Sequence, residues 1–297
     1  MLTTILFFIV KRVYLGLSSL PDYILNMCLR TFEIVARLLL HTPVFHNLRT
    51  NLDHSFPNLS KGEKEKIAHN HLRAVKQFAF DFIKSLKANE KYMKDKVEFK
   101  NLEILDELFQ TTPFVVCFSG HLLDYEMLIN LPLFRSEFAM CNIYQSTDTN
   151  DVFEKWICKE RCKYGAFAVP STSSYRYFMN IKKQLEAGTA KYKGYIIGVL
   201  GDTNPGKNNK LTVPFLNGYL DVYTGAERIG RKLNAAYVYA NIYHKGNGKY
   251  VVILNKLDTL EDSPFIYTKL YFERLESNIL NQPENWFLWN SNRFSYR

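Results

Sequence analysis

One stretch of the chain decides the fold: Pro113-Phe-Val-Val-Cys-Phe-Ser-Gly-His-Leu-Leu-Asp-Tyr-Glu-Met-Leu128. Residues 114–118 form a short β-branched and aromatic run between a proline and a glycine, which predicts a buried strand of a mainly parallel sheet. Residues 122–131 carry apolar side chains at helical spacing and predict a helix that ends at Pro132. Residues 119–121 then form a turn at the carboxyl end of a strand, where open α/β sheets bind ligands.

His121 has two acidic neighbours that could orient its imidazole. Five residues of an ideal helix span about 500°, so His121 and Glu126 meet only if His121 lies in the turn and points back over the helix. The carboxylate would then fix the tautomer and support the imidazolium that forms when the other ring nitrogen takes a proton. Asp124 is a competing partner. The alternative is a histidine at a helix start beside two solvated acids.

Length and charge limit the function classes. The 297 residues suffice for one large α/β domain with a substantial core. A net charge of +9 suits an anionic membrane surface, an acidic carrier protein or a nucleic acid. The aromatic residues fall within apolar runs and no nucleic-acid-binding module is recognisable, so we discount nucleic acid. The five cysteines lack a paired metal motif and indicate free thiols in a reducing compartment.

The N-terminal 50 residues predict a membrane-association segment ahead of a catalytic domain at residues 51–297. Lys11-Arg12 and then Pro21-Asp22 interrupt the apolar sequence, so no run reaches the roughly 18 uncharged residues of a spanning helix. No small-residue cleavage site follows the first apolar run, which argues against a signal peptide. We expect two amphipathic helices in the membrane interface. A helical hairpin packed on the domain and a single short span are the alternatives.

Further elements follow in the order expected of an α/β domain. Ser60 and Glu63 form a capping box that begins a long helix. Asp202 comes directly after an apolar strand and falls at the same sheet edge as His121, where it could bind an acceptor, pair with Arg161 or form a simple turn. The sequence predicts strands at 138–144, 166–170, 195–200, 235–242 and 250–257, and helices at 61–87, 102–109, 151–163, 222–233 and 264–280.

Several motifs resemble one known family. Gly-His-x4-Glu at residues 120–126 is similar to the H-x4-D/E motif of the lysophospholipid acyltransferase superfamily. It most resembles the bacterial lipid A biosynthesis (HtrB/LpxL-type) acyltransferases. Further pieces match in the family's order: Asn-Leu-x-x-x-Phe-Pro at 51–57, Asp-x-x-x-Gly at 202–206, Val-Pro-Phe-x-x-Gly at 213–218, and Pro-Glu-x-Trp-x-x-Trp-x-x-x-Arg-Phe at 283–294.

The resemblance implies a direct acyl transfer at the cytoplasmic face of a bacterial inner membrane. His121 would take the proton of an acceptor hydroxyl while Glu126 holds the imidazole. The oxygen would attack an acyl thioester on acyl carrier protein, and the acceptor would be a lipid A precursor or related glycolipid. Arg161 matches the family's helix arginine and could hold a phosphate or developing negative charge. The resemblance implies no cofactor, and no metal-ligand motif joins His121 to the nearby acids.

The chain departs from the family pattern at two places. Leu123-Asp-Tyr125 stands where Gly-Asn-Trp is common, and Tyr144-Gln145 stands where Tyr-Arg is usual. These departures leave acyl-chain and acceptor specificity open. A lysophospholipid or aminolipid acceptor is one alternative, and a non-enzymatic lipid-binding protein at the membrane surface is another. For Trp286 and Trp289 the sequence predicts buried packing.

Overall fold

The predicted strand at residues 114–118 is β2 (Phe114–Ser119), and every residue in it is buried. The computed structural model describes residues 2–122, 125–146, 152–205 and 210–292, with the main chain alone at 2–6 and 210. In this part of the chain β2 lies inside a seven-stranded sheet of order β1-β9-β8-β2-β5-β3-β4. Among the described strand pairs of this seven-stranded sheet, β8–β9 is antiparallel and the others are parallel. The predicted α/β fold with a mainly parallel sheet is confirmed.

The other strands follow the apolar runs of the sequence. Turn residues with positive φ, including Asn247 and Gly248, join β8 to β9 as the predicted hairpin. The strands are β1 (Val97–Lys100), β3 (Phe138–Tyr144), β4 (Phe167–Pro170), β5 (Gly194–Leu200), β8 (Ala236–Gly246) and β9 (Lys249–Lys256), with a separate antiparallel pair of β6 (Lys210–Phe215) and β7 (Gly218–Tyr223). We did not predict β1, because its four residues alternate apolar with charged and are too short to stand out.

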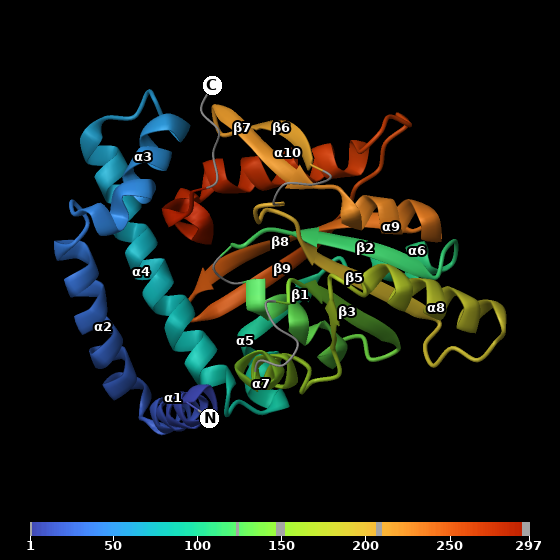
Figure 1. Cartoon of the computed structure of the whole chain (residues 1–297), viewed down its shortest axis with the longest axis horizontal. Helices are drawn as coiled ribbons and strands as arrows, with labels where there is room; N and C mark the ends of the chain where they lie inside the picture. The colour runs from blue at the N-terminus through green and yellow to red at the C-terminus, as the bar shows by residue number, and fades with distance from the viewer. Residues whose placement is uncertain (1, 123–124, 147–151, 206–209, 293–297) are drawn as a thin grey trace.

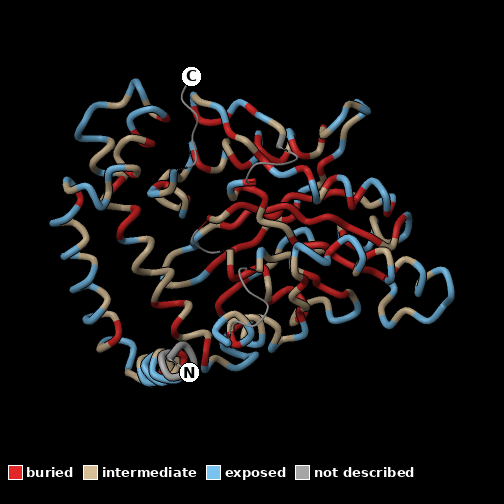
Figure 2. The backbone as a smooth tube through the Cα atoms, viewed as in Figure 1, coloured by how far each residue is buried: buried red, intermediate tan, exposed pale blue. Residues whose placement is uncertain are grey.

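Helices cover both faces of the sheet (Figure 1). The α8 (Ser174–Glu186), α9 (Gly225–Leu233) and α10 (Ile266–Asn281) helices pack on one face. The α5 (Glu90–Lys96) and α6 (Glu103–Phe109) helices and the 3-10 helix η2 (Tyr125–Leu133) pack on the other. Successive side chains of β2 alternate between two apolar cores, one under each layer. Figure 2 shows the strands as the most buried part of the chain.

Two of the expected helices differ from the prediction, and we did not predict α3 (His46–Ser55), α5 or α8. Residues 125–133 form a 3-10 helix rather than an α-helix, and Pro132 lies inside it. The helix predicted from residue 222 begins at Gly225, because residues 222–223 belong to β7. The helix α8 has a strongly amphipathic pattern that we did not recognise. All five cysteines are free thiols, as expected.

The N-terminal helices form an arm beside the sheet. They are α1 (Leu2–Ser19), α2 (Asp22–Leu38), α3 (His46–Ser55) and α4 (Lys61–Ser85), and α4 begins at the predicted capping box. Figure 1 shows α4 between α2 and the sheet. Large apolar side chains of α2 are exposed, including Tyr23, Met27, Phe32 and Leu38. Among the described residues, no helix has the length and apolar content that crossing a membrane requires.

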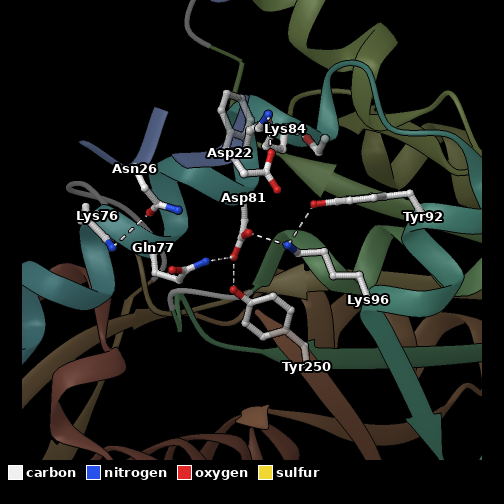
Figure 3. A network of polar contacts seen from close by, with 11 residues as sticks. Asp22, Asn26, Lys76, Gln77, Asp81, Lys84, Tyr92, Lys96 and Tyr250 are labelled. Carbon is white, nitrogen blue, oxygen red and sulfur yellow. Dashed lines mark hydrogen bonds and ion pairs between the residues drawn. The ribbon is translucent and has the colours of Figure 1, made fainter. Parts of the chain in front are cut away.

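A buried polar network fastens α4 to the sheet (Figure 3). Asp81 of α4 accepts hydrogen bonds from Lys96 of α5 at 2.5 Å and from Gln77 at 3.0 Å. It also accepts one from the hydroxyl of Tyr250 in β9. Lys96 in turn donates to the hydroxyl of Tyr92 at 3.3 Å. Because the side chains of Asp81 and Lys96 are 3% and 9% exposed, removing one charge would leave the other buried without its counter-charge.

We therefore expect Lys96→Met to lower the free energy of unfolding by about 3–5 kcal/mol, the cost of breaking a buried pair from one side. Equilibrium denaturation with urea measures it. Lys245→Met is the matched control, since Lys245 pairs at 2.8 Å with the exposed Glu98 and should matter little. If both variants unfold at the same urea concentration, the buried pair does not fasten the arm.

Candidate active site

The register of two neighbouring strands places His121 beside Asp202. Strands β2 and β5 are parallel, and Ser119 pairs with Leu200. Two residues beyond this pair in each segment, the backbone N–H of His121 donates to Oδ2 of Asp202 at 2.9 Å. Its ring Nδ1 lies 2.6 Å from Oδ1 of the same carboxylate. Asp202 is fully buried, so this carboxylate is held by protein groups at the sheet edge.

The C-terminal segment holds the same carboxylate from a third side. The indole Nε1 of Trp286 donates to Oδ2 of Asp202 at 2.9 Å. The backbone N–H of Phe287 donates to the carbonyl oxygen of His121 at 2.8 Å. Trp286 and Trp289 are both fully buried, as expected from packing. Trp286 therefore has a second role that the sequence did not predict, because a tryptophan in an aromatic run gives no sign of where its N–H points.

The turn before His121 needs a glycine because α10 lies directly behind it. A Cβ atom at Gly120 would lie 2.4 Å from Cδ1 of Leu275 and 3.4 Å from Oδ2 of Asp202. The hydroxyl of Tyr271 in the same helix donates to the carbonyl oxygen of Ser119 at 2.9 Å. This close approach of backbone and helix fixes the position from which the imidazole projects.

Asp202 makes the imidazole of His121 a stronger base than a free histidine. Burial is the largest influence on His121 and opposes its charge, but the attraction and hydrogen bond of Asp202 outweigh it, so the pKa of His121 is raised. Burial would likewise raise the pKa of Asp202, yet His121 and the three hydrogen bonds lower it. An ionised carboxylate only accepts hydrogen bonds, so Nδ1 of His121 carries the proton and Nε2 is the basic nitrogen.

Glu126 has a different partner from the one we expected. Its two carboxylate oxygens lie 3.1 Å from Nε of Arg161, and Nη2 of Arg161 makes a further short contact with it. Arg161 closes α7 (Val152–Arg161). The expectation that Glu126 holds the imidazole is therefore corrected, and Asp202, for which pairing with Arg161 was one possibility, is bonded to His121 instead. The physical reason is the strand register, which presents Asp202 to Nδ1 of His121.

Tyr125 joins the two charge pairs. Its ring packs edge-on against the imidazole of His121, with 5.1 Å between ring centroids. Burial first, and then the negative charge of Glu126, raise the pKa of its phenol, which keeps the hydroxyl protonated. We had noted Tyr125 only as a departure from a family motif. Asp124, a predicted supporting residue, lies outside the described residues.

A cavity of about 440 Å³ opens beside these side chains. His121, Glu126 and Arg161 form part of its wall, and further residues come from β2, β3, β4, β5, η2 and α7. Gly198 of β5 makes room there, because a Cβ atom on it would lie 2.4 Å from Oδ1 of Asn142. The wall is largely apolar, with Leu128, Ile129, Met140, Ile143, Phe153, Ile157, Phe167, Val199 and Leu200. The cavity suits a long apolar substrate with its reacting end at His121.

The family model of bacterial lipid A biosynthesis acyltransferases matches residues 1–295. The chain belongs to this family. It is accordingly an acyltransferase, and the family points to a lipid A-like acceptor. No curated protein matches the chain.

The acyltransferase brings most of the predicted site residues to one place. His121, Glu126 and Arg161 line the cavity, and Asp202 lies behind His121. Within the described part of the chain, no three histidine, cysteine, aspartate or glutamate side chains are arranged to hold a metal ion. What the sequence missed was the pairing: two acid–base pairs, His121–Asp202 and Glu126–Arg161, replace the single pair we predicted.

The arrangement predicts the titration of His121. In Asp202→Asn the attraction to the imidazolium is lost while the burial that opposes its charge remains, so the pKa of His121 should fall below its value in the unaltered acyltransferase. NMR titration of the labelled imidazole measures it. Glu126→Gln is the control and should lower this pKa less, because Glu126 acts only at a distance. An unchanged pKa in Asp202→Asn would contradict the pairing.

Proposed function

We propose that this acyltransferase moves a fatty acyl chain from the thioester of acyl carrier protein to a hydroxyl of a lipid A precursor or a related glycolipid. The observation that carries the proposal is the imidazole at the cavity wall. Nδ1 of His121 is bonded to a buried carboxylate, which leaves the basic Nε2 for a substrate hydroxyl. A general base held in this way is suited to activating an alcohol.

The reaction then proceeds in two steps, addition of the hydroxyl to the thioester and loss of the thiolate. Nε2 of His121 takes the hydroxyl proton as the acceptor oxygen forms a bond to the thioester carbonyl carbon, which gives a tetrahedral oxyanion. Asp202 stabilises the imidazolium during this step. The carbon–sulfur bond breaks next, the carbonyl reforms as an ester, and the imidazolium returns its proton to the departing thiolate. The carrier leaves as a free thiol and His121 is neutral again.

Arg161 is the proposed electrophilic group of the site. Its guanidinium lies at the wall of the same cavity, and a fixed cation there would stabilise the oxyanion or a phosphate of the acceptor. In this mechanism Glu126 positions Arg161 instead of His121, since the hydrogen bonds described above hold the guanidinium plane. Asp124 stays a proposed contact for the acceptor on sequence grounds alone.

The proposed partners are an acidic carrier, a lipid acceptor and a membrane surface. The net charge of +9 supports attraction of an acidic carrier and of anionic lipid. The exposed apolar side chains of α2 support an interfacial role for residues 1–50. We propose the cytoplasmic face of the bacterial inner membrane as the site of action. Membership of an acyltransferase family argues against the non-enzymatic alternative. A lysophospholipid or aminolipid acceptor is the second candidate.

Single-turnover acyl transfer tests the roles of the side chains. His121→Ala should slow the reaction about 10²–10⁴-fold, the usual contribution of a general base, and Asp202→Asn should cost a comparable factor. Mass spectrometry of the product identifies the acceptor. If His121→Ala retains full activity, the mechanism is wrong. If it is inactive but the product is an acylated lysophospholipid, only the acceptor is wrong.

Two tryptophan variants provide a matched control for positioning. Trp286→Phe and Trp289→Phe each shorten one fully buried indole and remove one hydrogen bond, the first from Asp202 and the second from a backbone carbonyl. Both should lower the free energy of unfolding, because each leaves a buried acceptor without its donor. Only Trp286→Phe should also lower the single-turnover rate, by about tenfold or more, because a hydrogen bond to a charged group contributes about 1.5–3 kcal/mol.

Ionic strength tests the carrier. Attraction between exposed charges is screened beyond about 8–10 Å near physiological ionic strength, so kcat/KM with acyl carrier protein should fall as salt rises. Transfer from the same acyl chain on coenzyme A serves as the comparison and should respond less. Salt-independent kinetics, or a strong preference for the coenzyme A thioester, would overturn the choice of donor.

A further inference from the structure

Four basic side chains gather on the helices α2 and α4 of the arm. Arg30 and Arg37 lie seven residues apart on one face of α2, and Arg73 and Lys76 lie three apart on one face of α4. Together they surround a hollow of about 320 Å³, which we call the basic hollow. It lies away from the His121 cavity, with which it shares no side chain.

The positive charge of the basic hollow is poorly compensated. Among the described residues of its wall, Glu33 is the one acid, and its carboxylate is bonded to Arg37 at 2.5 Å. The Nε of Arg37 is buried and has no hydrogen-bond partner among the described residues. In the same part of the chain, neither Arg30 nor Arg73 has an ion pair. Three cationic side chains in excess of carboxylate favour an anion there.

An apolar groove adjoins the basic hollow across the same helix pair. It measures about 490 Å³ and shares Glu33 and Lys76 with the hollow. Its walls come from α2, α4 and the 3-10 helix η4 (Phe287–Asn290). The apolar members of the wall are Leu29, Phe32, Ala36, Phe45, Leu72, Val75, Ala79, Phe287 and Leu288. Basic and apolar surfaces that meet at two shared residues match a molecule with an anionic head and a hydrocarbon chain.

Contacts at both ends keep α2 against α4 and leave the middle open. Near the start of α2, Lys84 pairs with Asp22 at 2.6 Å and Lys76 donates to Asn26 at 3.5 Å, as Figure 3 shows. Near its end, Arg37 reaches the backbone carbonyl of a residue on α4 at 3.5 Å. Lys76 and Arg37, which make two of these contacts, also line the hollow, so the contacts that join the helices fix the position of its wall.

We propose that the α2–α4 pair binds one membrane lipid whose phosphate head group carries a net negative charge. Arg30, Arg37 and Arg73 hold the phosphate, because planar guanidinium groups match phosphate oxygens in pairs. One acyl chain lies in the groove beside Phe287. A phosphorylated protein or a nucleic acid would satisfy the charges but would leave the groove without an apolar occupant. The exposed apolar side chains of α2, such as Phe32 at 72%, continue the apolar surface toward a bilayer.

The test uses the full chain and two short-chain lipids kept below their micelle concentration. Dihexanoyl phosphatidylglycerol should bind with one equivalent by calorimetry, and dihexanoyl phosphatidylcholine should bind at least about tenfold more weakly. Arg30→Gln/Arg73→Gln should abolish this preference. Arg176→Gln/Lys183→Gln, at two exposed positions of the distant helix α8, changes the net charge equally and should retain the preference. If both double variants behave alike, or the first binds as the unaltered chain does, the proposal is wrong.

A second arm tests the groove. Ala36→Phe should fill part of the groove and weaken phosphatidylglycerol at least about threefold, while inorganic phosphate should bind as weakly as before. Inorganic phosphate that binds as tightly as the lipid would overturn the proposal, since the groove would then hold no chain. His121→Ala should bind the lipid normally. If an inactive His121→Ala still binds the lipid, the lipid site is independent of the proposed reaction. If the active enzyme binds no lipid, the lipid proposal is wrong and the proposed reaction is unaffected.

Discussion

The contact between His121 and Asp202 is the constraint on which the site depends. It arises from the parallel register of β2 and β5. Both strands end at the same edge of the sheet, and His121 and Asp202 lie two residues past their last pair. A buried carboxylate must be satisfied by donors, and the three described above come from a ring, a backbone and an indole. The register of the sheet therefore sets the position of the imidazole, and the turn at Gly120 sets the point from which it projects.

Much of the architecture could be predicted from the sequence because its strands are strongly apolar and buried on both faces. Residues 114–119, 138–144 and 194–200 are such strands, and the turn at residues 245–248 marks its hairpin. Asp202 could be placed at the correct edge for the same reason. Its partner could not, since local spacing favoured Glu126, only five residues from His121, over a residue 81 positions away. Register between distant strands is a tertiary property that local periodicity does not contain.

The two charge pairs of the site divide the work that the sequence assigned to one. Asp202 is enclosed and faces the far side of the imidazole, where it raises the pKa of His121. Glu126 and Arg161 lie at the cavity wall, where a substrate can reach them. Two carboxylates in different surroundings can in this way serve one reaction, one through a histidine and one through an arginine.

The hydrogen bonds of Trp286 to Asp202 and of Phe287 to His121 have a consequence for folding during synthesis. The His121–Asp202 pair is formed by residues 121 and 202, but the carboxylate gains its indole donor only when residue 286 has left the ribosome and docked. A shorter nascent chain would hold a buried acid with one donor missing, which disfavours the ordered turn. Contacts this distant in sequence form late in folding. The carboxylate beside His121 therefore has all the described donors only when the segment that carries Trp286 is docked against the sheet edge.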